Sequence, residues 1–280
     1  MPHLTVPGAV LHYEVFGAGK PLFVFIPGAD GRGSIFHPVA KLLATYYTTV
    51  CWDRRGYSQS YLVGAQDFQH RLQADADDAH RLIQHLSPTS VATVFGTSSG
   101  AVVAQQLLST HPESVEKLIS HEPPSFSLLP HEKQVQGRSL IDHIYNTYRS
   151  QGYESAMSVF TSGLSNGPEA EIMRSCMDAK RGDEIRANCL FWFEFELRQY
   201  TGAEVDIEGL RRSKDKLVLV AGEDSGDGPS VEPMRVLSEE LQVQLLRVPG
   251  AHLGYVVDPA AFVRRLLDLR DNLRDNLRDR

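Results

Sequence analysis

One stretch decides the fold: Val91-Ala-Thr-Val-Phe-Gly96-Thr-Ser98-Ser-Gly100-Ala-Val-Val-Ala-Gln-Gln-Leu-Leu108. Its first five residues form an apolar, β-branched run of strand length, and residues 101–108 are mostly small or apolar, as in a helix that packs close to a sheet. The segment between them fits the pattern G-x-S-x-G, in which glycines allow a sharp strand-to-helix turn. The stretch therefore predicts a strand, a turn that lifts the hydroxyl of Ser98 above the sheet, and a helix.

A second match to the same pattern is Gly163-Leu-Ser-Asn-Gly167. No apolar run precedes it, and Pro168 follows it directly. Because the nucleophile turn needs a strand before it and a helix after it, we interpret this second match as an ordinary turn. Ser98 is therefore the predicted nucleophile.

Outward from Ser98, apolar runs of strand length alternate with stretches of helical period, which is typical of a mostly parallel sheet with helices on both faces. The first strands form an antiparallel hairpin around a Pro-Gly turn. The sequence thus predicts an α/β fold with a mostly parallel eight-stranded sheet. The predicted strands are the two arms of the hairpin within residues 4–16, then residues 21–26, 46–52, 91–95, 115–120, 217–221 and 244–248. The predicted helices include residues 66–86, residues 231–241 and a last helix from residue 259.

The alternation lapses after the sixth predicted strand, where the chain shows only helical patterns and loops. An insertion between two strands of one sheet is a lid and not a tandem domain. We expect one core domain, formed by residues 1–125 and 206–280, with a helical cap or lid formed by residues 126–205.

A serine hydroxyl is a weak nucleophile unless an imidazole, oriented by an acid, accepts its proton. Of the eleven histidines, His252 is best placed, since it follows a late strand and precedes the last helix. Two acids follow predicted strands, Glu122 in Ser-His-Glu-Pro-Pro and Asp224. We favour Glu122, because two prolines hold the backbone after it extended, and keep Asp224 as the alternative. His121 is interpreted as a packing or hydrogen-bonding residue.

An acyl-transfer site also needs two backbone N–H groups aimed at the developing oxyanion. We assign them to Ser99, which follows the nucleophile, and to Ala29 in the loop after the strand at residues 21–26. The glycines of residues 28–33 lack the Lys-Ser/Thr ending of a phosphate-binding loop and the spacing G-x-G-x-x-G. No cofactor and no metal ion are expected.

Together the loop Ile26-Pro-Gly-Ala, the segment Asp53-Arg-Arg-Gly-Tyr-Ser-Gln-Ser60, the turn at Ser98 and the loop at His252 resemble the α/β-hydrolase family. The resemblance implies a Ser-His-acid triad and an acyl-enzyme. In most members the acid follows the later strand, three residues past a glycine, where this chain has Ser225. The segments Ser98-Ser-Gly-Ala and Ser120-His-Glu-Pro-Pro together are similar to a branch that includes the zearalenone lactonases. In those lactonases the acid is the glutamate of the His-Glu motif, and this match implies Glu122.

The cap is rich in aromatic residues within Phe191-Trp-Phe-Glu-Phe195, which indicates an apolar or aromatic ester or lactone as substrate. We expect Trp192 first, then Phe191 and Phe195, to contact it. Consecutive helical residues cannot all face one way, so part of this group is expected to pack inside the cap.

The composition of the chain limits which binding partners and which cellular location we expect. The net charge of −7 and the absence of a basic cluster argue against nucleic acid as a partner. The longest apolar run, residues 22–26, is far shorter than the about 20 residues of a membrane span, and the N-terminus has no signal pattern. Three cysteines with no pairing pattern favour a reducing, cytoplasmic location.

Three functions fit this pattern. The first is a serine esterase or lactonase acting on a small molecule. The second is a cofactorless perhydrolase or C–C bond hydrolase with the same triad, and the third is a ligand-binding sensor with slow turnover. The C-terminal repeat places Leu269, Leu273 and Leu277 on one helical stripe, which reads either as a solvated extension or as a homodimer contact.

Overall fold

A nine-stranded sheet forms the centre of the molecule in the computed structural model, which describes residues 2–162 and 168–278. Its strands are β1 (His3–Val6), β2 (Ala9–Phe16), β3 (Leu22–Ile26), β4 (Thr48–Trp52), β5 (Tyr61–Leu62), β6 (Ala92–Thr97), β7 (Val115–His121), β8 (Leu217–Gly222) and β9 (Leu245–Val248). The neighbouring strands β4, β3, β6, β7, β8 and β9 pair in parallel, and β1 and β2 form the antiparallel hairpin at one edge.

The sheet confirms the predicted α/β fold. Eight strands lie on one continuous path, β1-β2-β4-β3-β6-β7-β8-β9, and the additional strand is the two-residue β5, which pairs with β2. All five side chains of β3 are buried, as expected for a strand covered on both faces.

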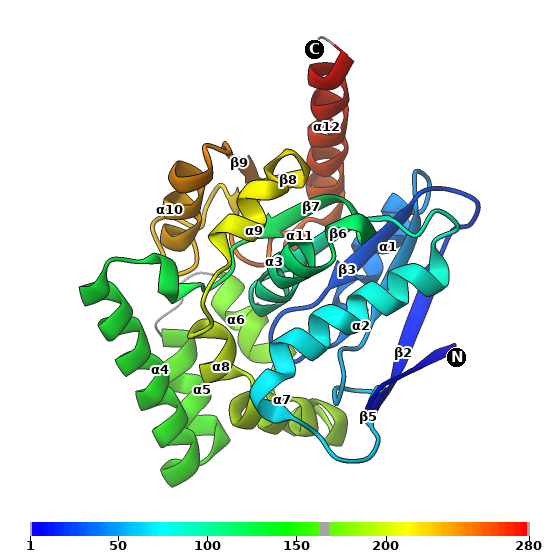
Figure 1. Cartoon of the computed structure of the whole chain (residues 1–280). Coiled ribbons are helices and arrows are strands. Elements are labelled where there is room, and N and C mark those ends of the chain that lie inside the picture. Colours follow the sequence, from blue (N-terminus) through cyan, green and yellow to red (C-terminus); the bar gives the residue numbers. More distant parts are fainter. Residues whose placement is uncertain (1, 163–167, 279–280) are drawn as a thin grey trace.

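Helices cover both faces of this sheet (Figure 1). One face is packed by α2, α3, α9 and α10, and the other by α1, α11 and α12. The bounds of these helices are α1 (His37–Leu43), α2 (Arg71–Leu86), α3 (Ser99–Thr110), α9 (Ile207–Arg212), α10 (Glu232–Leu241), α11 (Gly254–Val257) and α12 (Pro259–Arg278).

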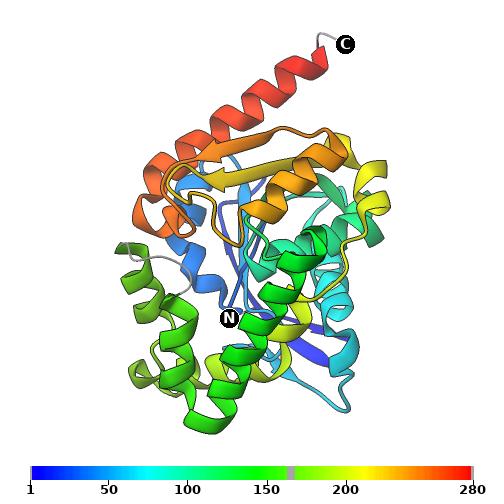
Figure 2. The same cartoon turned by 90° about the vertical axis from the view of Figure 1, so that its left-hand side faces the viewer.

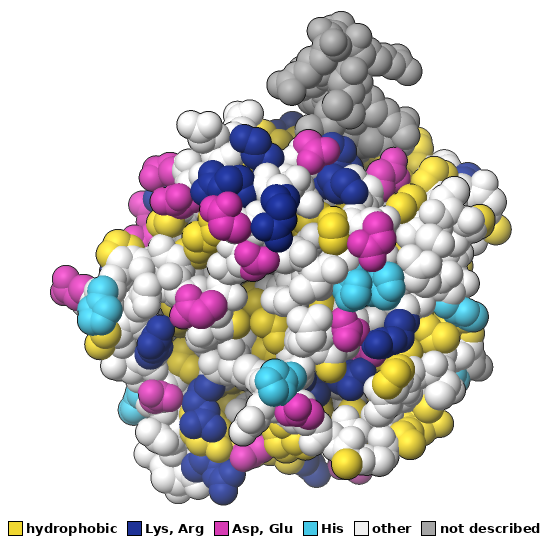
Figure 3. Space-filling model, viewed as in Figure 1, with side chains coloured by type: hydrophobic (Ala, Val, Ile, Leu, Met, Phe, Trp, Pro, Cys, Tyr) yellow, Lys and Arg dark blue, Asp and Glu magenta, His cyan; other side chains and the backbone are white. Residues whose placement is uncertain are grey.

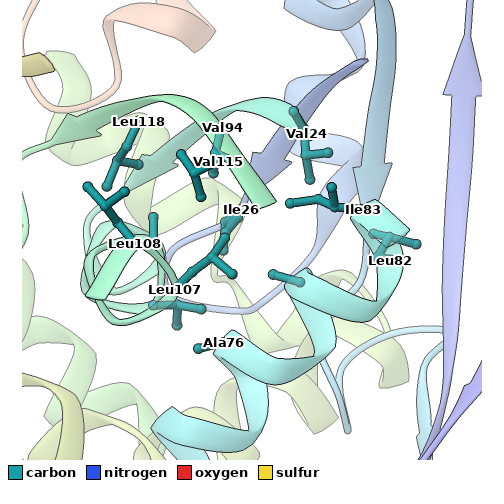
Figure 4. Packing of buried hydrophobic residues seen from close by; sticks show 14 of the residues in the cluster. Val24, Ile26, Ala76, Leu82, Ile83, Val94, Leu107, Leu108, Val115 and Leu118 are labelled. Carbon is teal, nitrogen blue, oxygen red and sulfur yellow. The ribbon is translucent and has the colours of Figure 1, made fainter. Parts of the chain in front are cut away.

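The packing of α2 and α3 on the sheet follows from the spacing of their apolar residues. On α2, Ala76, Leu82 and Ile83 recur at helical spacing and are fully buried. In Figure 4 they belong to one cluster with Leu107 and Leu108 of α3 and lie below Val24 and Val94 of the central strands. This cluster holds α3 close to the sheet, and α3 begins directly after Ser98.

Two predicted elements begin later than the apolar pattern indicates. The strand predicted from residue 46 begins at Thr48, because the N–H groups of Tyr46 and Tyr47 donate to the Leu43 carbonyl and close the end of α1. The helix predicted from residue 66 begins at Arg71, because the Asp67 carboxylate accepts from the N–H groups of residues 69 and 70 and stabilises a 3-10 turn there.

Between β7 and β8 the described residues form helices and no strand. The strand before this segment, β7, is the sixth of the eight path strands in chain order. The first five of these helices gather at one end of the molecule, away from the projecting end of α12 (Figure 2). They are α4 (His131–Gln151), α5 (Tyr153–Ser162), α6 (Pro168–Cys176), α7 (Asp183–Phe195) and α8 (Leu197–Thr201).

Two features predicted from the sequence fall wholly or partly outside the residues that the structure describes. The second G-x-S-x-G match, residues 163–167, lies outside the described residues. The helix α12 extends beyond the body of the molecule in both cartoon views, and the side chains of Leu273 and Leu277 are likewise outside the described part. Among the residues that the structure describes, no helix combines the length and the apolar composition needed to cross a bilayer.

We predict that Leu82→Ala lowers the free energy of unfolding by about 2–5 kcal/mol, because it removes a fully buried side chain between α2 and the sheet and leaves a cavity. Leu42→Ala is the matched control, since Leu42 is 44% exposed, and it should change that free energy by less than about 1 kcal/mol. Urea denaturation followed by circular dichroism measures both. Equal effects of the two variants would contradict the packing described here.

Candidate active site

Ser98 stands on the sharp turn between β6 and α3. Its backbone has φ 54° and ψ −131°, a conformation that residues with a side chain rarely adopt. The turn is fixed by hydrogen bonds from the Ser98 N–H to the His121 carbonyl, 2.9 Å, and from the Ala101 N–H to the Ser98 carbonyl, 2.9 Å. The serine is therefore held at the end of β6, in front of the N-terminus of α3.

The glycines of the motif are required by close contacts. A Cβ atom on Gly100 would lie 2.3 Å from the Ile26 carbonyl oxygen, and one on Gly96 would lie 2.6 Å from the Gly100 carbonyl oxygen. A Cβ on Gly28, in the loop after β3, would lie 2.9 Å from the Cβ of Ser98. No larger residue fits at these three positions without moving the backbone, which explains the spacing G-x-S-x-G.

His252 and Glu122 form a hydrogen-bonded pair, with 2.6 Å between Nδ1 of the imidazole and Oε2 of the carboxylate. The other carboxylate oxygen, Oε1, accepts from the Gly222 N–H at 2.8 Å. Glu122 is fully buried and follows β7 directly, with φ 49°. Since β6 and β7 pair with Thr97 opposite His121, Ser98 and Glu122 leave the sheet at the same edge.

The electrostatics of the pair favour a carboxylate beside an imidazolium. Burial alone would raise the pKa of Glu122, but the imidazoles of His121 and His252 and the hydrogen bond from His252 hold that pKa below its ordinary value. Burial alone would lower the pKa of His252, but its hydrogen bond to Glu122 and the charges of Glu122 and Glu169 raise that pKa. The pair therefore stabilises positive charge on the imidazole, which lines the same cavity as Ser98.

His121 has a different role from His252. It is fully buried, and its Nδ1 lies 2.8 Å from the hydroxyl of Thr97. Burial lowers the pKa of His121 to about 4, so the ring is neutral near pH 7. Its ring lies 5.9 Å from that of His252, nearly parallel to it. This agrees with the expectation of a packing and hydrogen-bonding residue.

Asp224, the alternative acid, is exposed, and its N–H donates to the Gly250 carbonyl. Nδ1 of His252 is bound to Glu122 instead. Ser225, at the position where most members carry the acid, borders the same small cavity as Glu122 and His252. The geometry thus brings Glu122, and not Asp224, to the imidazole.

The predicted oxyanion donors also border the site. Ala29 and Ser99 line one cavity together with Ser98 and His252. Within the described residues, no acceptor is recorded for the N–H of Ala29 or of Ser99. Both N–H groups are therefore available to a negatively charged oxygen beside Ser98.

This cavity holds about 790 Å³ of non-protein space, including its mouth, and lies between the sheet edge and the cap. Glu196 and Tyr200 add polar groups to its wall. Its other cap residues are apolar except for Thr201 and comprise Phe126, Leu140, Ile141, Ile144, Phe160, Met173, Trp192, Leu197 and Thr201.

Of the three predicted aromatic contacts, the structure brings only Trp192 to this cavity. Phe195 stacks on Phe68 with ring centroids 4.0 Å apart, and Phe191 packs edge-on against Tyr57 and beneath the Arg71 guanidinium. The reason is helical geometry: residues 191 and 195 share one face of α7, and Trp192 is rotated away from it. Phe191 and Phe195 therefore hold the cap onto the core and do not line the predicted substrate site.

Sequence reasoning missed a buried charge network around Arg54. Its guanidinium donates to the carbonyls of Pro27 and Gly28, 3.0 and 2.8 Å, and to carboxylate oxygens of Asp75 and Glu196, both 2.7 Å. Burial alone would lower the pKa of Arg54, but Glu196 and Asp75 raise it, so the group stays charged. Tyr57 donates to the other oxygen of Glu196. A glutamate directly after the aromatic run of α7, Glu196, was the available signal for this network.

Sequence reasoning also missed Glu169 of α6. Its two carboxylate oxygens accept from the N–H groups of Ala251 and Leu253, at 2.9 and 2.8 Å. These two residues flank His252. Nothing in the sequence around position 169 signals this contact.

One group of metal-ligand side chains lies outside the cavity, namely His80, His111 and Glu113. Their polar atoms already have protein partners: Nδ1 of His80 lies 2.7 Å from the Ser114 hydroxyl, and Nε2 of His111 lies 2.8 Å from Asp77. The group therefore reads as a hydrogen-bonded surface cluster.

Charges of both signs are mixed on the surface drawn in Figure 3, where Lys and Arg side chains lie among Asp and Glu. This face carries no continuous basic stripe of the kind that a phosphate backbone requires. The expected absence of nucleic-acid and membrane partners stays a prediction.

Comparison with known proteins adds independent findings. Residues 21–162 match the family model described as alpha/beta hydrolase fold. The chain is 32% identical to the uncharacterized hydrolase YraK of Bacillus subtilis, over 95% of this chain and 94% of YraK. An enol-lactonase of Burkholderia xenovorans superimposes with a TM-score of 0.71 at 14% identity, covering 95% of this chain and 98% of the other. A carboxylesterase of Nitrososphaera gargenis gives 0.69 at 21% identity, covering 98% and 100%. At these low identities, the similarity shows that this chain shares its fold with the two solved structures.

We predict that Glu122→Gln lowers the pKa of His252, because it removes the carboxylate that raises this pKa. Asp224→Asn is the matched control, since it removes an exposed charge after the neighbouring strand β8 and should leave the titration of His252 nearly unchanged. NMR titration of the histidine ring resonances, with the His252 signal assigned from its loss in His252→Gln, measures both. A larger effect of Asp224→Asn would make Asp224 the acid.

Proposed function

The chain belongs to the α/β-hydrolase family, and from that premise we propose that it is a serine hydrolase that cleaves an ester or lactone of a small, largely apolar or aromatic substrate. One observation carries the proposal. Ser98, on its strained turn, borders the same cavity as His252, whose imidazole is hydrogen-bonded to the buried Glu122.

In the proposed mechanism, Nε2 of His252 accepts the proton of the Ser98 hydroxyl as its oxygen attacks the acyl carbon. The negative charge then forms on the former carbonyl oxygen, beside the N–H groups of Ala29 and Ser99. Glu122 accepts from Nδ1 and stabilises the imidazolium during this step.

Collapse of the tetrahedral intermediate breaks the bond to the leaving oxygen, which receives the proton from His252. The product is an acyl-enzyme on Ser98 and a free alcohol, or one opened chain in the case of a lactone. Water then attacks the acyl carbon while His252 accepts its proton, and a second collapse releases the carboxylic acid and restores Ser98.

The substrate class rests on the cavity wall. Trp192, Phe160 and the aliphatic residues of α4 favour an apolar or aromatic acyl group or alcohol. The names of the structural relatives, an enol-lactonase and a carboxylesterase, are consistent with ester-bond chemistry. The similarity to zearalenone lactonases rests on two short segments, Ser98-Ser-Gly-Ala and Ser120-His-Glu-Pro-Pro, so we propose the acid position from it and not the substrate.

We also propose the division into a core, residues 1–125 and 206–280, and a cap, residues 126–205. Its support is a third apolar cluster, formed mainly by cap residues such as Ile144, Met157 and Phe193, apart from the two clusters on the sheet. Phe126 and Leu129 belong to this cap cluster, which is consistent with a boundary near residue 125.

The proposals for cellular location and for assembly rest on fewer observations. The three cysteines, Cys51, Cys176 and Cys189, are unpaired thiols in the structure, which supports a reducing compartment such as the cytoplasm. A homodimer through the C-terminal repeat remains an alternative to a solvated extension, and sedimentation of a chain truncated after residue 268 would separate the two.

We predict that the purified protein hydrolyses a short p-nitrophenyl ester and that Ser98→Ala lowers kcat/KM by at least about 10⁴-fold, because it removes the nucleophile. A fluorophosphonate should label the wild-type chain at Ser98, as mass spectrometry of the peptides would show. Ester hydrolysis equal in the two proteins would remove Ser98 from the mechanism. Absence of hydrolysis from the wild type would favour the ligand-binding sensor.

We predict that Trp192→Ala raises KM for an aromatic ester by about 10-fold, whereas Phe195→Ala changes KM less than about 2-fold and lowers the thermal midpoint instead. Trp192 borders the cavity, and Phe195 packs against Phe68 of the core. Steady-state kinetics and thermal denaturation of both variants test this. A larger effect of Phe195→Ala on KM would restore Phe195 to the substrate site.

A further inference from the structure

The helix α6 of the cap meets the loop that carries His252. The Glu169 carboxylate, in the first turn of this helix, accepts from the N–H of Ala251 at 2.9 Å and from the N–H of Leu253 at 2.8 Å. One side chain therefore binds the main chain on both sides of His252. Hydrogen bonds to an ionised carboxylate are among the stronger ones in proteins, and two bonds from one group also fix direction.

The loop itself supplies no acceptor for these two donors among the described residues. It follows β9, turns at Gly250 with φ 80°, and passes into the short helix α11. Among the described residues, Glu169 is the acceptor recorded for both N–H groups. Leu253 is buried, so its N–H group gave up a hydrogen bond to water when the chain folded. Without the Glu169 carboxylate this buried donor would have no acceptor, which costs free energy.

The same helix reaches the other parts of the site. Met173, one turn after Glu169, lines the substrate cavity. At the end of α6, the Cys176 carbonyl accepts from the Arg32 guanidinium at 3.4 Å, and Arg32 pairs with Asp30 beside Ala29 at 3.0 Å. The helix α6 thus links the His252 loop, the cavity wall and the loop of the predicted oxyanion hole.

We propose that Glu169 is a positioning residue for His252: by binding the N–H groups of Ala251 and Leu253 it holds the imidazole between Glu122 and Ser98, and it makes this alignment depend on the seating of the cap helix α6. The expected effect on kcat rests on the proposed function, because it assumes that His252 acts as the base for Ser98. The placement of the imidazole itself does not depend on the substrate.

Glu169 also acts on the charge of His252. Among the described residues, the charged or titratable groups that face His252 are His121 at the end of β7, Glu122 directly after it, Glu169 from α6, and Asp224 across the small cavity beside the imidazole. The charges of Glu122 and Glu169 both raise the pKa of His252. Removal of the Glu169 charge therefore lowers this pKa, and neutral imidazole persists to lower pH. A residue that only stabilises the fold would not shift this titration.

The experiment compares wild type with Glu169→Gln, Glu169→Asp and Glu171→Gln. Glu169→Gln removes the charge and keeps the size, and Glu169→Asp keeps the charge but shortens the side chain. Glu171→Gln is the matched control, because Glu171 is an exposed glutamate on the same helix. For each protein, kcat and KM for a p-nitrophenyl ester are measured between about pH 5 and pH 9, and His252 is titrated by NMR.

We expect Glu169→Gln to lower kcat about 10- to 100-fold with KM within about 3-fold, because the imidazole is misplaced while the cavity is kept. Its acid limb of kcat/KM and the pKa of His252 should both move to lower pH. Glu169→Asp should lower kcat with the acid limb near its wild-type position, and Glu171→Gln should match wild type throughout. Thermal denaturation shows whether each variant is folded.

Wild-type kcat together with wild-type titration of His252 in Glu169→Gln would overturn the proposal, as would an equal loss of kcat in Glu171→Gln. If the wild type hydrolyses no ester while Glu169→Gln still shifts the His252 titration, the proposed function fails and the positioning of the imidazole by Glu169 is supported.

Discussion

The charge of Arg54 is the constraint on which the arrangement of the site depends. A guanidinium with no exposed surface must be neutralised, and here its partners come from α2, through Asp75, and from the cap, through Glu196. The same group binds the carbonyls of Pro27 and Gly28, next to Ala29. Because loss of one partner of a buried ion pair costs about 3–5 kcal/mol, this network couples the stability of the cap segment, α2 and the loop after β3.

Local patterns predicted the sheet, the turn at Ser98 and the place of His252, because each depends on residues that are near in sequence. The run at residues 91–108 contains its own strand, turn and helix, and its glycines allow the close contacts that the sharp turn requires. Strand ends were enough to restrict the acid to two positions. The strand ends could not decide between Glu122 and Asp224. That choice depends on which of the two carboxylates lies within reach of the imidazole, and the two follow the neighbouring strands β7 and β8.

The cap could not be predicted to the same depth. The aromatic run of α7 indicates burial, but the direction of each ring depends on what the helix packs against, and residues 191 and 195 meet Tyr57 and Phe68 of the core. The contacts of Arg54 with Glu196, and of Glu169 with the loop at His252, join residues more than 80 positions apart. No periodicity or local motif reports such pairs.

The hydrogen bond between Glu122 and His252 joins residues 130 positions apart, with the whole cap between them in the chain. During synthesis, Ser98 and Glu122 are made before the segment 126–205, and His252 is made only after it. The nascent chain can pair its central strands early, but Glu122 and His252 can meet only after the residues between them are made and β8 and β9 join the sheet. Such non-local contacts form slowly relative to helices, so this hydrogen bond belongs to the late steps of folding.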